Sequence, residues 1–210
     1  MNTEQTIETF NKTGVLYYKD IGEGMQRHLK HDDPRFEFLS VERFSRGLGL
    51  DWGCGSNRFS STVLSVDNYP HKEADLVIDI SHTNFPFKDN VFDFVFSSHA
   101  IEDVEPKYSQ RVFDELTRVI KVGGYMALLI PDMERGRYPK FDELFTAESP
   151  EVIRGERQIG ELCGNPGHKY NAGLTCLHDW VNNSKYKFEI VQKDTLPHSQ
   201  MTLDFVIQKL

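Results

Sequence analysis

Two aspartates and two glycines in the first half of the chain have the types and the spacing of a ligand-binding site. Asp51 and Asp67 each follow a short apolar run, and Gly53 and Gly55 come directly after the first aspartate. If the two runs are neighbouring parallel strands, both carboxylates lie at one edge of the sheet, beside a glycine turn that lets a ligand approach the backbone. Such a pair of acids suits a nucleoside-like ligand that has a ribose diol and a cationic end.

Glycine-rich turns also occur in dinucleotide-binding proteins, so the two kinds of site have to be distinguished. A dinucleotide site has a third glycine three positions after the second, and it binds pyrophosphate at a helix N-terminus. Arg58 stands three positions after Gly55, and Asp51 would repel a pyrophosphate directly before the turn. The same carboxylate would attract an ammonium group, so the charge at position 51 favours a cationic ligand over NAD.

Three further segments follow this turn in an order that resembles a known family. Ala74–Ile80 resembles a third strand, Phe85–His99 an "LPF" loop and a fourth strand, and Phe113–Tyr125 a helix, a glycine turn and a fifth strand. Together with Asp51–Gly55, which has the pattern D-x-G-C-G, they resemble the class I S-adenosylmethionine-dependent methyltransferases, in the small-molecule branch called methyltransferase type 11. The resemblance covers residues 47–132 and continues more weakly to the C-terminus.

The resemblance implies an α/β fold with a doubly wound, Rossmann-like, seven-stranded and mostly parallel sheet that ends in a C-terminal antiparallel hairpin. We expect a single methyltransferase domain over residues 1–210, with the S-adenosylmethionine-binding core at 47–132. Residues 1–46 would form an N-terminal cap, residues 133–185 a substrate-side insert, and residues 186–210 the terminal hairpin.

Local patterns predict individual elements. An apolar stripe and an early Pro106 predict a helix over 106–121, followed by Gly123-Gly124. A second helix is expected at 174–181, and strands at 186–191 and 203–207. Because Asp51 and Asp67 lie only 16 positions apart, the first crossover helix should be truncated or replaced by a loop.

The resemblance implies S-adenosylmethionine as the cofactor. Asp67 would bind the ribose hydroxyls, Asp79 the adenine amino group, and Asp51 the methionine ammonium, directly or through water or neighbouring amides. Asp67 and Asp79 also fit a simpler role as residues that start turns. The other residues assigned to the cofactor are Trp52, Gly53, Cys54, Gly55, Asn68, Ile80 and Ser98.

His99 and His168 are the candidate catalytic residues. His99 follows the expected fourth strand, where this fold presents the transferred methyl group, and imidazole can act as a general base near neutral pH. A histidine that only lines the site is the alternative for His99, and a surface-loop histidine is the alternative for His168. Glu102, Asp103 and Glu105 fit an acidic helix N-terminus, or recognition of a cationic acceptor.

Composition narrows the class of partner and the compartment. The formal net charge of −8, without basic blocks, argues against nucleic-acid binding. Three widely spaced cysteines favour a reducing compartment over a disulfide framework, and Cys54 has no partner base nearby in sequence. We expect no metal site, because no usual zinc spacing is present among Cys163, His168, Cys176 and His178. Without a membrane-length apolar run or a signal peptide, a cytoplasmic protein is expected.

These features predict direct transfer of a methyl group to an oxygen or nitrogen atom of a small metabolite or sugar. The Pro-Pro and Pro-Cys motifs of enzymes that methylate bases or glutamine are absent after the expected fourth strand. One alternative is a catalytically inactive S-adenosylmethionine-binding partner or regulatory protein. The other is an NAD-dependent enzyme, which Asp51 and Arg58 disfavour. The acceptor and the oligomeric state are left open.

Overall fold

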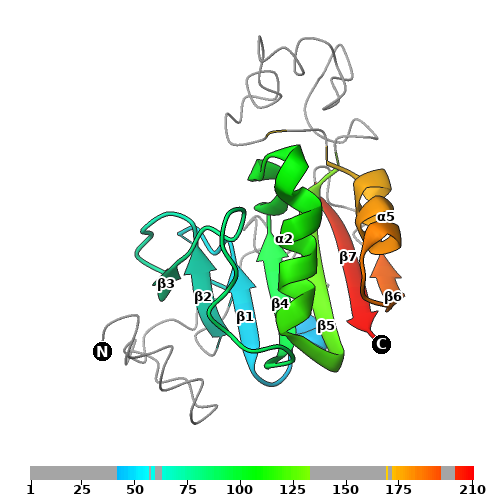
Figure 1. Cartoon of the computed structure of the whole chain (residues 1–210), viewed down its shortest axis with the longest axis horizontal. Helices are drawn as coiled ribbons and strands as arrows, with labels where there is room; N and C mark the ends of the chain where they lie inside the picture. The colour runs from blue at the N-terminus through cyan, green and yellow to red at the C-terminus, as the bar shows by residue number, and fades with distance from the viewer. Residues whose placement is uncertain (1–41, 57, 60–62, 133–168, 170–171, 195–201) are drawn as a thin grey trace.

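The computed structural model describes residues 42–56, 58–59, 63–132, 169, 172–194 and 202–210. In this part of the chain the strands form one seven-stranded sheet in the order β3-β2-β1-β4-β5-β7-β6 (Figure 1). The sheet is mostly parallel and ends in an antiparallel hairpin, which confirms the predicted α/β fold class.

The strands differ in length and in direction. The parallel strands are β1 (Gly49–Trp52), β2 (Val63–Asp67), β3 (Leu76–Val77), β4 (Phe92–Ser98) and β5 (Ile120–Pro131). The predicted hairpin consists of β6 (Phe188–Lys193) and β7 (Thr202–Lys209), and β7 runs antiparallel between β5 and β6. The middle of the sheet therefore combines strands that are far apart in sequence.

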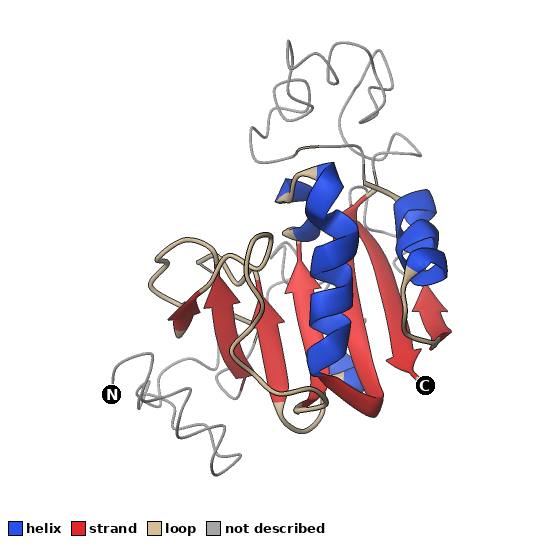
Figure 2. Ribbon diagram, viewed as in Figure 1, coloured by secondary structure: helices blue, strands red, loops and turns tan. Residues whose placement is uncertain are grey.

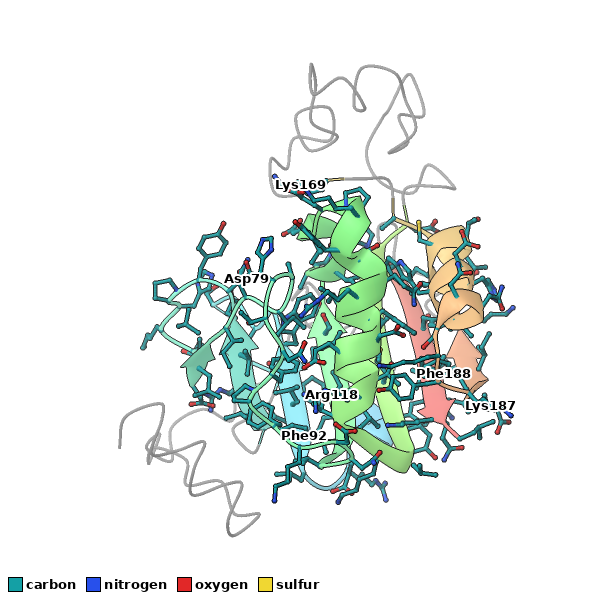
Figure 3. All side chains as sticks on the ribbon, in the orientation of Figure 1. Asp79, Phe92, Arg118, Lys169, Lys187 and Phe188 are labelled. Atoms are coloured by element: carbon teal, nitrogen blue, oxygen red, sulfur yellow. The ribbon has the colours of Figure 1, made fainter. Side chains whose placement is uncertain are left out.

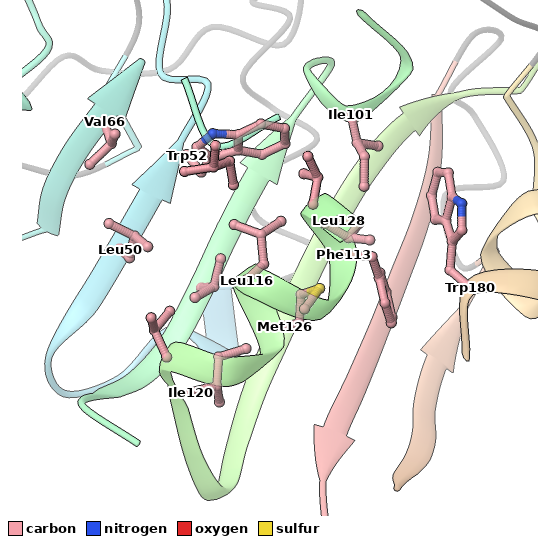
Figure 4. Packing of buried hydrophobic residues seen from close by; sticks show 14 of the residues in the cluster. Leu50, Trp52, Val66, Ile101, Phe113, Leu116, Ile120, Met126, Leu128 and Trp180 are labelled. Carbon is pink, nitrogen blue, oxygen red and sulfur yellow. The ribbon is translucent and has the colours of Figure 1, made fainter. Parts of the chain in front are cut away.

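Two helices cover one face of the sheet. Figure 2 shows α2 (Pro106–Val119) over its middle strands and α5 (Leu174–Asn183) over β7 and β6. Phe113 of α2 and Trp180 of α5 pack with their ring centroids 6.0 Å apart in the main hydrophobic core (Figure 4). Full burial of a phenylalanine side chain contributes roughly 1.5–3 kcal/mol, so apolar packing is the main stabilising contribution in this layer.

The helix α2 begins at Pro106, as predicted, but ends at Val119, two residues before the predicted end. Its last carbonyl groups are taken by another element, because the Lys209 ammonium donates to the carbonyl oxygens of Thr117 (3.0 Å) and Ile120 (2.7 Å). The chain then passes directly into β5, so the predicted glycine turn lies inside that strand.

The third strand is shorter than the predicted range 74–80, because two flanking aspartates bind backbone amides. The Asp75 Oδ2 atom accepts a hydrogen bond from the Ser65 amide (3.0 Å), and the Asp79 Oδ1 atom accepts one from the Ser81 amide (2.9 Å). These side-chain bonds turn the chain away from the ladder.

The opposite face of the sheet carries a second buried cluster, and within the described ranges no α-helix covers it. The cluster consists of Val63, Phe94, Phe96, Ala127, Leu129 and Val206. The Phe59 ring lies on Phe96, with centroids 4.3 Å apart, and Phe44 comes from a short 3-10 helix, η2 (Glu42–Phe44). The described residues between β1 and β2 form turns and bends, as the short spacing predicts.

Several expectations fall on residues outside the described part of the chain. These include residues 1–41 of the expected cap, residues 133–168 of the expected insert, and both His168 and Cys163. The internal division of the domain therefore stays a prediction. None of the described helices is long and apolar enough to cross a membrane.

Candidate functional site

The carboxyl ends of β1, β2 and β4 lie side by side at one edge of the sheet. Asp51 lies beside Ser65 of β2, and Trp52 lies beside Ser97 of β4. Asp67 is the last residue of β2 and Asp51 the second-to-last of β1, so both aspartates lie near the carboxyl ends of neighbouring strands, as predicted. The indole of Trp52 is buried in the main core beneath this edge (Figure 4).

Two glycines with positive φ form the turn after β1, and their surroundings differ. Gly53 has a φ of 74°, and a Cβ added to it would lie 2.2 Å from the Cβ of Ala100. Gly55 has a φ of 52°, and a Cβ added there would meet nothing within 4 Å. Gly53 therefore permits a close internal contact, whereas Gly55 leaves open space next to the backbone.

The carboxylate of Asp67 fixes this turn. Its Oδ2 atom accepts a hydrogen bond from the Gly55 amide (2.9 Å), and its Oδ1 atom accepts one from the Tyr69 amide (3.0 Å). The Tyr69 bond is the turn that was the simpler alternative for this residue. A carboxylate has about four acceptor positions, so Asp67 can bind further donors while it holds both amides.

Asp51 has a different environment from Asp67. It is only 1% exposed, and its Oδ2 atom accepts a hydrogen bond from the Phe59 amide (2.7 Å). Burial raises the pKa of Asp51 to about 7, against the opposing effects of the Phe59 amide and the Arg58 charge. Asp51 therefore titrates near neutral pH and has no open face toward a ligand.

Arg58 fastens the loop after the glycine turn to the segment before β3. Its Nη2 atom lies 2.7 Å from the Asp75 Oδ1 atom and donates to the Glu73 carbonyl oxygen (2.9 Å). This partly buried ion pair stands where the usual crossover helix would begin.

Cys54 lies in the turn as a packed thiol. It is 5% exposed, and burial together with the Asp51 and Asp67 charges raises the pKa of its thiol to about 12. The thiol is therefore neutral and unsuited to act as a nucleophile. Among the described residues, no group of three or more His, Cys, Asp or Glu side chains could hold a metal ion.

The loop after β3 carries the residues expected to contact adenine. Asp79 is exposed at the carboxyl-terminal side of the sheet (Figure 3), whereas Ile80 is buried. Arg111 of α2 holds this loop: its Nη1 atom donates to the carbonyl oxygens of Ile80 and of Thr83 (3.1 Å), and its Nη2 atom donates to the Asn84 Oδ1 atom (2.8 Å). The helix thereby positions a loop that lies about thirty residues before it.

His99 follows β4 directly, with a φ of 51° and its side chain 34% exposed. Its Nε2 atom lies 2.9 Å from the Thr202 Oγ1 atom, and its Nδ1 atom lies 3.5 Å from the Glu102 Oε1 atom. The amide of Lys169 donates to the Glu102 carbonyl oxygen (2.9 Å), above the start of α2 (Figure 3). The predicted acidic cluster is divided, because Glu102 is fully buried while Glu105 is exposed and pairs with Lys107 (2.7 Å).

Most assigned residues thus come together at one edge, while others were missed. The missed residues are Arg111, Glu102 in its place beside His99, and Thr202. His99 and Glu102 are only three positions apart in the sequence, which was a usable signal for their contact. Nothing local points to Thr202, which is 103 positions from His99.

This edge and the sheet behind it can be compared with known proteins. Residues 50–128 match the family model of the methyltransferase domain. An S-adenosylmethionine-dependent methyltransferase from Mesorhizobium loti is similar at 16% identity and a TM-score of 0.55, over 82% of this chain and 97% of that chain. One from Archaeoglobus fulgidus is similar at 13% identity and a TM-score of 0.57, over 83% of this chain and 92% of that chain.

A third structure, Burkholderia thailandensis 1,6-didemethyltoxoflavin-N1-methyltransferase, contains 1,6-didemethyltoxoflavin and S-adenosylhomocysteine. It is 12% identical with a TM-score of 0.54, over 84% of this chain and 76% of that chain. A search of curated proteins finds no significant sequence match. The family match spans Asp51, the glycine turn, Asp67, Asp79 and His99, and the likeness of fold extends across the sheet. Residues 50–128 therefore match a methyltransferase domain, and the sheet around them has the fold of S-adenosylmethionine-dependent methyltransferases.

Proposed function

We propose that the chain binds S-adenosylmethionine at the carboxyl edge of β1, β2 and β4 and transfers its methyl group to an oxygen or nitrogen atom of a small metabolite or sugar. The observation that carries this proposal is the open backbone at Gly55 beside the Asp67 carboxylate. A glycine turn with free space next to a strand-end acid suits a nucleoside with a ribose diol.

The residues at this edge fit the cofactor. Asp67 has acceptor capacity left for the ribose hydroxyls, and Asp79 is exposed, so it can accept from the adenine amino group. The buried Asp51 would act on the methionine ammonium through water or through the amides of the turn. Trp52, Cys54 and the remaining assigned residues would shape the site around these contacts, the exposed Asn68 near the ribose and Ser98 near the methionine end.

When bound, S-adenosylmethionine supplies a methyl group on a sulfonium that needs no further activation. The residues of this chain therefore mainly have to orient two reactants, which supplies about 7–11 kcal/mol in well-oriented intramolecular models. His99 would add general-base catalysis, of order 10²-fold to 10⁴-fold, where the acceptor is a hydroxyl group. His168 remains a second candidate for a base or a substrate ligand.

A small acceptor agrees with the composition and with one structural relative. The net charge of −8 disfavours polyanionic acceptors such as nucleic acids. The Burkholderia structure holds 1,6-didemethyltoxoflavin together with S-adenosylhomocysteine in a protein of the same fold.

Calorimetric titration with S-adenosylhomocysteine, with NAD as the control, tests the cofactor assignment. We expect micromolar binding of S-adenosylhomocysteine and none of NAD, followed by transfer of a labelled methyl group to members of a panel of sugars and small metabolites. Binding without turnover on any acceptor would instead favour the inactive partner or regulatory protein. Binding of NAD alone would overturn the proposal.

A further inference from the structure

His99 is held in an unusual conformation next to the glycine turn. Its φ of 51° lies in the left-handed region, which costs a residue with a side chain roughly 1–2 kcal/mol. Its amide donates to the Leu129 carbonyl oxygen of β5 (2.8 Å), and the next residue, Ala100, contacts Gly53. The backbone of His99 is therefore held in place, and the residue that follows it touches the turn assigned to the cofactor.

A buried carboxylate lies beside one ring nitrogen of this imidazole. The 3-10 helix η3 (Ile101–Asp103) returns the chain so that the Glu102 Oε1 atom lies 3.5 Å from His99 Nδ1, and Glu102 is 0% exposed. Catalytic hydrogen bonds of free enzymes are often this long and shorten when substrate binds. Asp103 and Lys169, of opposite charge, lie near this pair.

The other ring nitrogen has a hydroxyl partner. Thr202, at the start of β7, places its Oγ1 atom 2.9 Å from His99 Nε2. If Glu102 holds a proton on Nδ1, then Nε2 is the acceptor and the Thr202 hydroxyl is the donor. The Thr202 hydroxyl therefore lies where the hydroxyl group of an acceptor would donate its proton to Nε2.

We propose that Glu102 and His99 form one unit in which Nε2 of His99 takes the proton of a hydroxyl acceptor, so that the protein methylates alcohols or phenols rather than amines. This inference rests on the proposed methyl-transfer function. His99 is the catalytic residue, and Glu102 is a positioning residue that selects its tautomer. The acceptor hydroxyl replaces the Thr202 hydroxyl as the donor to Nε2.

The step balances in atoms and charge. The acceptor oxygen bonds to the methyl carbon as the carbon–sulfur bond breaks, and the sulfur keeps that electron pair. The hydroxyl proton moves to Nε2, and Glu102 stabilises the resulting imidazolium. The proton then leaves to water, because the His99 side chain is 34% exposed.

The need for such a base distinguishes the two classes of acceptor. A hydroxyl oxygen is a weak nucleophile that must lose its proton as it attacks. A neutral amine attacks through its lone pair and can lose its proton to water afterwards. An oriented carboxylate–imidazole pair therefore accelerates methylation of a hydroxyl and is dispensable for an amine.

The first test needs no acceptor and reads the ring nitrogens of His99 by isotope-edited NMR in the wild-type protein and in Glu102→Gln. We expect the neutral wild-type ring to carry its proton on Nδ1, and Glu102→Gln to lose this preference. Glu105→Gln is the matched control, because it removes the same charge from an exposed residue of the same segment. A proton on Nε2 in the wild-type ring, or an unchanged tautomer in Glu102→Gln, would overturn the assignment of Glu102.

The second test compares paired probes, phenol with aniline and para-cresol with para-toluidine, because these phenols keep their proton and these amines are neutral at pH 7. On the hydroxyl probes, His99→Gln should lower kcat by on the order of 10²-fold or more, and Glu102→Gln by about tenfold, with KM for S-adenosylmethionine unchanged. On the amine probes, both variants should methylate with a kcat close to that of the wild-type protein. Equal losses on both probes, or none, contradict the proposal. If the wild type methylates neither member of a pair, the His99 tautomer seen by NMR decides whether the assignment of Glu102 and His99 holds.

Failure of this inference can be separated from failure of the proposed function. Binding of S-adenosylhomocysteine with transfer only to amines would refute the hydroxyl assignment and leave methyl transfer intact. Absence of S-adenosylhomocysteine binding to the wild-type protein would refute both.

Discussion

The two halves of the sheet are stabilised in different ways. On the side of β3, β2 and β1, the described parts of the connections are loops held by hydrogen bonds from side chains to backbone, as from Arg58 to Glu73 and from Arg111 to Ile80. On the side of β5, β7 and β6, helices α2 and α5 bury apolar side chains against the strands (Figure 1). The residues assigned to the cofactor lie almost entirely in the first half.

This difference separates binding from stability. Hydrogen bonds from side chains fix individual loop atoms but contribute only about 0.5–1.5 kcal/mol each, whereas apolar burial contributes more and is less directional. We therefore expect substitutions in the loop-rich half to change ligand affinity, and substitutions in the helix-covered half to change the free energy of unfolding.

The largest expected effect is on stability, from Phe113→Ala in the helix-covered half. Phe113 is fully buried, so the free energy of unfolding should fall by about 3–5 kcal/mol in urea titrations. Val122→Ala, at a position 68% exposed in β5, is the control and should change it by less than about 0.5 kcal/mol. Loss of S-adenosylhomocysteine affinity in the still-folded Phe113 variant would show that the halves are not separable.

Asp67→Asn should have the largest effect on affinity. An amide keeps the size of the side chain but loses a charge that accepts hydrogen bonds, so the Kd for S-adenosylhomocysteine should rise on the order of 10²-fold. Calorimetry measures this change, with Asp179→Asn on the exposed side of α5 as the control. An unchanged Kd would remove Asp67 from the ribose site.

Arg111→Gln tests whether α2 positions the adenine loop. The variant loses donors to Ile80 and Thr83, so affinity for S-adenosylhomocysteine should fall by about tenfold, and preference over its inosine analogue should weaken. Lys107→Gln, exposed in the first turn of α2, is the control. If affinity falls while the preference for adenine is kept, the loop acts on another part of the cofactor.

The smallest expected effect is the release of part of a proton from Asp51 when the ligand binds. Because its pKa in the free protein is raised to about 7, a bound ammonium should lower that pKa and release part of a proton at neutral pH. Affinity should then rise with pH through about 7. Calorimetry in two buffers of different ionisation enthalpy measures the release, which should vanish in Asp51→Asn. A release that persists in this variant belongs to another group.

The same residue makes a prediction for the protein without ligand. The unfolded chain loses the Asp51 proton near pH 4, whereas the folded chain keeps it until about pH 7. The stability contributed by Asp51 is therefore complete below pH 4 and is lost as pH rises to about 7. In urea titrations across this range, Asp51→Asn should show a flatter dependence on pH than the wild type.

The sequence was sufficient where local patterns decide the structure. Apolar runs ending in Asp51 and Asp67 predicted two strands and their shared edge, and the early Pro106 predicted where α2 begins. These features depend on residues close together in the chain. The seven-stranded, mostly parallel sheet with its antiparallel hairpin followed from the family resemblance.

The sequence was insufficient where side chains reach distant backbone or distant side chains. Asp75 and Asp79 shortened β3 by binding amides, a competition that propensity does not resolve. The burial of Asp51 depends on how the loop at Phe59 folds back, and the hydroxyl partner of His99 comes from Thr202 at the far end of the chain. Such contacts exist only once the sheet has assembled.

The close approach of Gly53 and Ala100 limits how lineages of this protein can diverge. A Cβ at position 53 would lie 2.2 Å from the Cβ of Ala100, and the φ of 74° at Gly53 disfavours any other residue there. A bulkier residue at position 100 would press on the same turn. Although Ala100 has no reactive group and lies outside helix and strand, we expect substitutions there to be purged almost as strictly as those at Asp67.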